Sequence, residues 1–168
     1  AAGAHFNSPK LEEGAHAFVT EHFEDVSKHG EIMGMVHRQG PIVFSRRALR
    51  NGWNSKTDGS NVCIHEWAHV LDMDNGFADG IPVLAGDTEH WDEVLKEELE
   101  RVRKGRSALR AYAGTNRAEL FACAAEAFFE RPGPLKKKDG ELYELLCEAF
   151  GFDEGVLGVD HAGAEALA

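Results

Sequence analysis

The sequence has little positive charge. Its 168 residues include 18 lysines and arginines against 29 aspartates and glutamates, which gives a formal net charge of −11 at pH 7. A protein dedicated to nucleic acid needs a basic surface to meet the phosphates, and so does a protein that binds an anionic membrane surface. The composition therefore argues against nucleic acid and membranes as partners.

Cysteines and long apolar runs are also few. The three cysteines, Cys63, Cys123 and Cys147, form no CxxC pair, which excludes a zinc ribbon and a thioredoxin-type motif. We expect them to be buried free thiols in a reducing compartment. No run reaches the roughly 18 apolar residues of a membrane span, and no signal-peptide pattern opens the chain, so we expect a cytoplasmic protein. The first residue is Ala1 and not methionine, which fits a processed protein or a piece of a longer one.

The length predicts a single domain over residues 1–168, with about 15 peripheral residues at each end. Residues 17–26 fit a strand edge and a helix face equally well, and the stretch 28–45 contains strand-like pieces, MVH and PIVF. A polar loop is predicted over 51–60, with Ser60 as the N-cap of the next helix. Helices are predicted from residue 61 up to a loop at 75–87, and then over 88–105, 116–130 and 139–150, with Lys136 to Lys138 in a loop. Thr115 and Asn116 offer the N-cap of the helix 116–130.

The stretch NVCIHEWAHVLDMDNG, residues 61–76, contains an HExxH motif made of His65, Glu66 and His69. Residues four apart share one face of a helix, so the two imidazoles could hold one zinc ion at roughly 2.0–2.1 Å. Glu66 could take a proton from a water on that ion. The alternative is an ordinary buried helix with two satisfied core histidines. The apolar surroundings favour the metal site, because two histidines and a glutamate would be costly there without partners.

A catalytic zinc ion needs a third protein ligand. The metzincin pattern fails, because residue 72 is Asp and residue 75 is Asn. Glu119 and Glu126 lie seven apart on one face of the alanine-rich helix 116–130 and are the best sources. Glu119 is also the fourth member of a capping box, and Glu126 and Glu130 could face solvent, so spacing alone leaves the choice open.

Asp72 and the remaining histidines are further polar residues that could take part in this metal site. Asp72 either holds a ligand histidine in one tautomer or caps and bridges locally, and the sequence favours neither. The remaining histidines lie in polar or terminal surroundings and are not expected to be ligands. They are His5, His16, His22, His29, His37, His90 and His161.

Three stretches resemble the Mlc titration factor A family of zinc metallopeptidases: GPIVFS, HEWAHVLDMDNGFADGIP and YAGTNRAELFACAAEAFFERP. The similarity covers residues 40–150, and the two central motifs are specific in combination. The family is related to the catalytic domain of anthrax lethal factor, so the resemblance implies a zincin-like fold. It also implies one Zn²⁺ per chain, a peptide or protein substrate, and a transcriptional regulator as a partner.

The resemblance implies roles for individual residues. In the family, HExxH supplies two ligands and the general base, which fall here on His65, His69 and Glu66. The third ligand is the glutamate of a Tyr-x-x-Thr-Asn-x-Ala-Glu motif, which falls on Glu119. Tyr112 opens that motif and is implied to face the metal, where its hydroxyl would stabilise the oxyanion of the tetrahedral intermediate.

Two features depart from the family's pattern. The residues 46–49, Arg-Arg-Ala-Leu, replace a Trp-containing segment, which bears on substrate contacts. The N-terminal part is shorter than in the bacterial regulators, which bears on partner binding more than on the metal site.

We therefore predict an α+β, zincin-like fold, in which a small N-terminal sheet packs on a buried HExxH helix and a second ligand-bearing helix lies across the cleft. The predicted function is zinc-dependent peptide hydrolysis at a gluzincin-type His/His/Glu site, with aminopeptidase-like activity implied by the resemblance. Glu66 would move a proton from the water to the leaving amine, and Tyr112 would support the oxyanion. The alternatives are a regulatory protein-binding module with a structural zinc ion and little turnover, and a metal-dependent hydrolase of non-peptide amides or esters.

Overall fold

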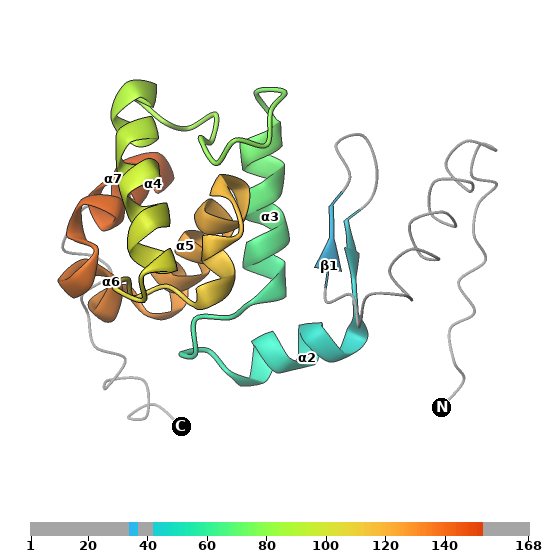
Figure 1. The fold of residues 1–168 in the computed structure, drawn as a ribbon. Coiled ribbons are helices and arrows are strands. Elements are labelled where there is room, and N and C mark those ends of the chain that lie inside the picture. Colours follow the sequence, from blue (N-terminus) through green and yellow to red (C-terminus); the bar gives the residue numbers. More distant parts are fainter. Residues whose placement is uncertain (1–33, 37–41, 153–168) are drawn as a thin grey trace, which may run out of the picture. The chain divides into compact units, whose positions relative to one another are not determined.

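The computed structural model describes residues 34–36 and 42–152, all of which lie in one compact unit of the chain. The described part is mostly helical, and Figure 1 shows helix α3 beside α5 within it. The predictions for residues 17–26, for the strand-like piece around residue 37 and for the C-terminal tail lie outside the described residues.

A two-stranded antiparallel sheet opens the described part. Strands β1 (Gly34–Met35) and β2 (Val43–Phe44) pair with Gly34 opposite Phe44. Strand β1 contacts α3, the helix that carries the HExxH motif.

Helix α2 (Arg46–Asn54) follows the sheet directly, and part of it was predicted to be loop. The predicted polar loop over 51–60 is wrong for residues 51–54, which form the last turns of this helix. The helix starts because the Ser45 hydroxyl accepts a hydrogen bond from the backbone N–H of Ala48 at 3.0 Å. Gly52 is buried against Asn61, and this contact across the chain outweighs the low helix propensity of glycine.

Helix α3 (Val62–Met73) carries the HExxH motif. Its N-cap is Asn61 and not Ser60, because Asn61 Oδ1 accepts hydrogen bonds from the N–H groups of Cys63 and Ile64 at 3.0 and 3.4 Å. The helix is also not buried all round, since Trp67 is 57% exposed. Trp67 lines an apolar pocket whose other walls include Phe129 and Phe150.

Helix α5 (Arg117–Glu130) is the central element of the core. The predicted cap is confirmed, because Asn116 Oδ1 accepts from the N–H of Glu119 at 2.9 Å. Every residue from Leu120 to Phe128 is buried. The five alanines and one cysteine among the residues 117–127 allow close approach of neighbouring helices.

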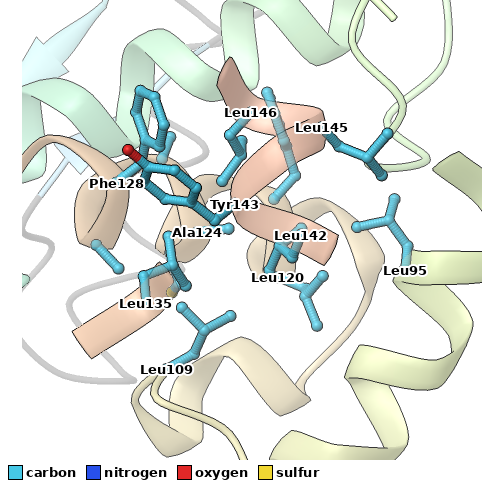
Figure 2. Packing of buried hydrophobic residues seen from close by; sticks show 14 of the residues in the cluster. Leu95, Leu109, Leu120, Ala124, Phe128, Leu135, Leu142, Tyr143, Leu145 and Leu146 are labelled. Carbon is cyan, nitrogen blue, oxygen red and sulfur yellow. The ribbon is translucent and has the colours of Figure 1, made fainter. Parts of the chain in front are cut away.

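The other helices complete the core around α5. They are α4 (Thr88–Arg103), the 3₁₀ helix η1 (Ala111–Gly114), α6 (Pro132–Lys138) and α7 (Gly140–Phe150). Figure 2 shows side chains of α4, α5, α6 and α7 packed together, including Leu95, Leu120, Phe128, Leu135, Leu142 and Tyr143. The prediction that Lys136 to Lys138 lie in a loop is wrong, because burial of Leu135 holds them in the last turn of α6.

Asp72, near the end of α3, fastens the loop that follows this helix. The side chain is fully buried, and its Oδ1 accepts a hydrogen bond from the N–H of Gly80 at 2.8 Å. Of the two roles left open by the sequence, the structure therefore shows the local bridge. Gly80 has φ +82°, and a Cβ there would lie 2.5 Å from the carbonyl oxygen of Arg117, so only glycine fits. The loop is thus pinned against the start of α5.

Burial raises the pKa of Asp72 to about 6, although the hydrogen bond from Gly80 opposes the rise. Within the described residues, Asp72 Oδ2 is buried and has no hydrogen-bond partner. The charged form therefore lacks half of the hydrogen bonding that a buried carboxylate needs.

We predict that Asp72→Asn stabilises the protein increasingly as the pH rises. The pKa of Asp72 is higher in the folded than in the unfolded protein, so the folded state holds the extra proton and stability is lost as the pH rises toward 6. The asparagine keeps an acceptor for Gly80 and carries no charge. Its advantage in free energy of unfolding should grow by about 2 kcal/mol between about pH 4.5 and about pH 7.5.

Urea denaturation of the metal-free proteins at the two pH values measures this difference. The exposed Asp74→Asn is the matched control, and its effect should stay within about 0.5 kcal/mol at both. An equal pH response in the two variants would contradict the assignment.

Candidate metal centre

Three predicted ligand atoms converge between α3 and α5. His65 Nε2 lies 3.2 Å from His69 Nε2 and 3.0 Å from Glu119 Oε2, and His69 Nε2 lies 3.7 Å from the same oxygen. Ligands placed at roughly 2.0–2.1 Å around one tetrahedral zinc ion are about 3.3 Å apart. The triangle formed by these three atoms matches that spacing.

The local structure explains how the triangle forms. One turn of α3 separates His65 from His69, so both imidazoles leave the same face of the helix. Glu119 is in the first turn of α5, where Asn116 caps its backbone N–H. The capping-box alternative for Glu119 therefore accounts for its backbone, while its side chain is free to reach the histidines.

The chemistry of these donors fits a divalent cation. Glu119 Oε2 is buried, and the imidazole nitrogens of His65 and His69 are the polar groups that face it. A buried carboxylate oxygen is costly without compensation, and a cation bound between Oε2 and the two imidazoles would supply it. One Glu and two His are a donor set that zinc accepts.

The electrostatics of the site point the same way. Burial alone would lower the pKa of His65, but Cys123, Glu119 and Glu126 beside it raise that pKa to about 11. Burial likewise opposes ionisation of Glu119, but its contacts with His65 and His69 outweigh burial and hold its pKa well below the usual range. The site therefore favours positive charge, whether a proton or a metal ion carries it.

Glu66 lies beside the triangle, on α3, and is 5% exposed. Burial, together with the nearby charges of Glu119 and Glu126, raises its pKa, while His65 and His69 oppose the rise. A raised pKa makes a carboxylate a stronger base.

Strand β1 passes directly over Glu66. A Cβ at Gly34 would lie 2.5 Å from Glu66 Oε1 and 2.6 Å from Val62 Cγ2. Glycine at this position lets the strand approach the carboxylate, so the sheet forms one wall beside the predicted base.

Tyr112 lies in η1 with its ring half exposed, and its centroid is 6.1 Å from that of His65. Burial and the neighbouring charge of Glu119 raise the pKa of Tyr112 to about 12. The phenol therefore stays protonated at neutral pH and can donate a hydrogen bond near the triangle. The structure thus brings all five predicted site residues together.

A second layer behind the ligands was not foreseen from the sequence. Glu126 is 1% exposed, and its Oε1 lies 2.7 Å from His65 Nδ1. Arg110 Nη2 donates to the same oxygen, and the N–H of Asn61 donates to Oε2. Glu126 therefore faces Nδ1 of His65, a predicted ligand, and not solvent.

Glu130 is also buried, so the alternative that it faces solvent is wrong. Its Oε2 accepts from the N–H groups of Gly59 and Ser60 at 3.0 and 3.1 Å, and its Oε1 from Asn61 Nδ2 at 2.9 Å. The spacing of Glu119, Glu126 and Glu130 placed them near one another on α5, but it carries no signal for the depth at which α3 covers them.

Other polar residues are explained without a second site. His65, Cys123 and Glu126 form another group with ligand spacing, but the Arg110 guanidinium already bonds to Cys123 Sγ and Glu126 there and supplies the positive charge. His90 is 3.8 Å from Glu141 on the protein surface. The other six histidines outside the motif lie outside the described residues.

The cysteines and the helices bear on the remaining expectations. All three cysteines are free thiols; Cys123 and Cys147 are buried as predicted, while Cys63 is only partly buried. Among the described residues, no helix has the length and apolar character needed to cross a membrane.

Comparison with known proteins identifies the family of the chain. Residues 13–151 match the family described as glucose-regulated metallo-peptidase M90. Mlc titration factor A of Escherichia fergusonii is 35% identical over 127 residues, which cover 70% of this chain and 47% of that protein. The Mlc titration factor A of Cronobacter sakazakii is 33% identical over 129 residues, covering 71% and 48%. An uncharacterized protein of Synechocystis is 30% identical over 130 residues, covering 73% and 46%.

These matches confirm the resemblance seen in the two central motifs. The chain spans about half the length of the curated relatives it matches. The family match covers most of the described residues, including both ligand-bearing helices. The chain belongs to the M90 family of glucose-regulated metallo-peptidases.

Proposed function

We propose that this chain is a zinc-dependent peptidase domain of zincin-like fold, with His65, His69 and Glu119 as the ligands of one Zn²⁺. The observation that carries the proposal is the triangle of three ligand atoms at 3.0–3.7 Å, with a buried carboxylate and a phenol beside it. A gluzincin-type site has this donor set. We extend the proposal to the chain as one catalytic domain, residues 1–168.

The residues around the triangle have separate roles in this proposal. A bound zinc ion would polarise the scissile carbonyl and lower the pKa of a water. Glu66 takes the proton of the attacking water and delivers it to the leaving amine. Tyr112 donates its phenolic proton in a hydrogen bond to the oxyanion of the tetrahedral intermediate. Tyr112 is half exposed, so a substrate can reach its side chain from solvent.

The substrate class follows from the family and not from the geometry. We propose peptide or protein substrates with aminopeptidase-like cleavage, in a cytoplasmic protein whose free cysteines suit a reducing compartment. The same residues would also hydrolyse non-peptide amides or esters, and a substrate panel separates these classes.

A regulatory binding module is the second candidate. Its support is the name of the relatives, Mlc titration factor A, which links those proteins to Mlc. By analogy, this chain would bind a transcriptional regulator and keep zinc for structure. The buried Glu66 counts against a purely structural site, because a structural ion needs no adjacent base.

Removing the third ligand should remove the metal. We expect close to one zinc ion per purified wild-type chain and a marked loss in Glu119→Ala, because two imidazoles alone hold zinc weakly. Metal analysis after dialysis measures both. Glu144→Ala, an exposed carboxylate on α7, is the control and should keep its zinc. No bound zinc in the wild type, even after addition of the metal, would overturn the enzyme assignment.

Replacing the base should separate chemistry from metal binding. Glu66→Gln keeps the shape of the side chain but cannot accept the proton, so kcat should fall about 10²–10⁴-fold while the zinc content is unchanged. Steady-state kinetics on peptides, with metal analysis in parallel, measures the split. Full turnover in this variant would rule out Glu66 as the base. If the variant still binds a regulator, that binding does not depend on peptide hydrolysis.

The phenol should act on the transition state and not on the metal. Tyr112→Phe removes one hydrogen-bond donor, so kcat should fall about 10²–10³-fold with little change in KM or zinc content. Kinetics with one peptide substrate decides the point. A loss confined to KM would show that the tyrosine binds substrate only.

A further inference from the structure

Arg110 connects the parts of the chain that build the metal centre. It precedes η1 and is partly buried, with a side chain 29% exposed. Its Nη1 donates to Ser60 Oγ at 2.9 Å and its Nε to Cys123 Sγ at 3.2 Å, while Nη2 donates to Glu126. One guanidinium thus contacts the segment before α3, the middle of α5, and its own loop.

The geometry around Glu126 fixes which nitrogen of His65 can act as a ligand. Arg110 Nη2 lies 3.3 Å from His65 Nδ1, and both face Glu126 Oε1. The carboxylate Oε1 only accepts, so its 2.7 Å contact places a proton on His65 Nδ1, and a guanidinium, which has only donors, cannot hydrogen-bond to that nitrogen. Both groups therefore donate to Oε1, which leaves Nε2, the atom that faces His69 and Glu119, as the nitrogen that can give up its proton to a metal.

The negative charge of Glu126 also requires its contact with Arg110. Glu126 is 1% exposed and lies near two further carboxylates, Glu66 and Glu119. A buried carboxylate that loses its cationic partner is strongly unfavourable and draws its neighbours out of position. In the described part of the chain, the lysine or arginine side chain within ion-pair distance of Glu126 is that of Arg110.

Arg110 also touches the predicted oxyanion donor. Its guanidinium carbon is 5.4 Å from the centroid of the Tyr112 ring, a cation–π contact on a ring that is otherwise half exposed. The same side chain therefore orients the Nδ1 side of the His65 ring through Glu126. It also contacts one face of the Tyr112 ring directly.

We propose that Arg110 is a positioning residue that sets the orientation of His65 and Tyr112 together, so that metal affinity and turnover depend on one guanidinium. The role of Tyr112 in this inference rests on the proposed function. The effect of Arg110 on His65 is measured independently, by metal binding.

The test compares Arg110→Met and Arg110→Lys with the wild type by zinc affinity and by the visible absorption of the Co²⁺-substituted protein. Arg110→Met should bind zinc about 10–100-fold more weakly and change the cobalt spectrum, because the ligand loses its hydrogen-bonded support. Arg110→Lys keeps the charge but not the fork, so it should recover part of the affinity. On peptides, kcat should fall more than KM rises.

Arg101→Met is the matched control. Arg101 also bridges two buried carboxylates, Glu98 and Asp139, and its side chain is 39% exposed. These carboxylates lie in α4 and between α6 and α7, and not on α3 or α5, which carry the predicted ligands. This variant should lose thermal stability while its zinc affinity and cobalt spectrum stay unchanged. If Arg110→Met fails to fold, Arg110→Lys carries the comparison.

The outcomes separate this inference from the proposed function. Wild-type zinc affinity and an unaltered cobalt spectrum in Arg110→Met, with lower stability alone, would overturn the inference and leave the peptidase proposal standing. Weaker zinc binding without any peptidase activity in the wild type would support the role toward His65 and refute the enzyme. A wild type that binds no metal would refute both.

Discussion

The contact between Glu126 and His65 determines how the rest of the centre is arranged. It joins α5 to α3 through a hydrogen bond of 2.7 Å in the interior, and it points the other nitrogen of His65 at His69 and Glu119. The alanines of α5 let the two helices approach closely enough for this bond. The triangle of predicted ligand atoms, the buried Glu66 and the Tyr112 phenol all depend on that approach.

Charge balance explains why the surrounding residues are where they are. The carboxylates of Glu66, Glu119 and Glu126 lie close together in a largely buried space. Each needs a compensating group, because an uncompensated charge in the interior costs several kcal/mol, on the order of 3–5 in typical proteins. Arg110 compensates Glu126, the N–H of Asn61 adds a hydrogen bond, and the two histidines face Glu119. A metal ion would complete the balance on the triangle side.

The sequence predicted the elements whose signals are local. The HExxH helix, the Asn116 cap of α5 and the helix that ends at Phe150 follow from periodicity and capping, and they were found within a few residues. The family motif picked Glu119 over Glu126, which spacing alone could not do. The ring centroid of Tyr112 lies 6.1 Å from that of His65, and the role of Tyr112 at the metal stays a prediction.

What the sequence did not predict depends on packing between distant segments. Residues 51–54 read as loop because they are polar and contain glycine, yet Gly52 is buried against Asn61. Ser60 is as good a cap as Asn61 by residue type, and Glu130 decides between them by binding both backbone and side chain of this segment. Arg110 has no local signal, since its partners lie 13 to 50 residues away in the chain.

The glutamates of α5 have a consequence for folding. Glu126 and Glu130 bind the N–H groups of residues 59–61, across 65 to 71 residues of sequence. The segment that leads into α3 is therefore held by a helix that the chain reaches only much later, and the N–H groups of residues 59–61 gain these acceptors only when α5 packs against α3. We expect α3 and α5 to open as one cooperative unit, with the amide hydrogens of Gly59, Ser60 and Asn61 exchanging with solvent only when that whole unit comes apart.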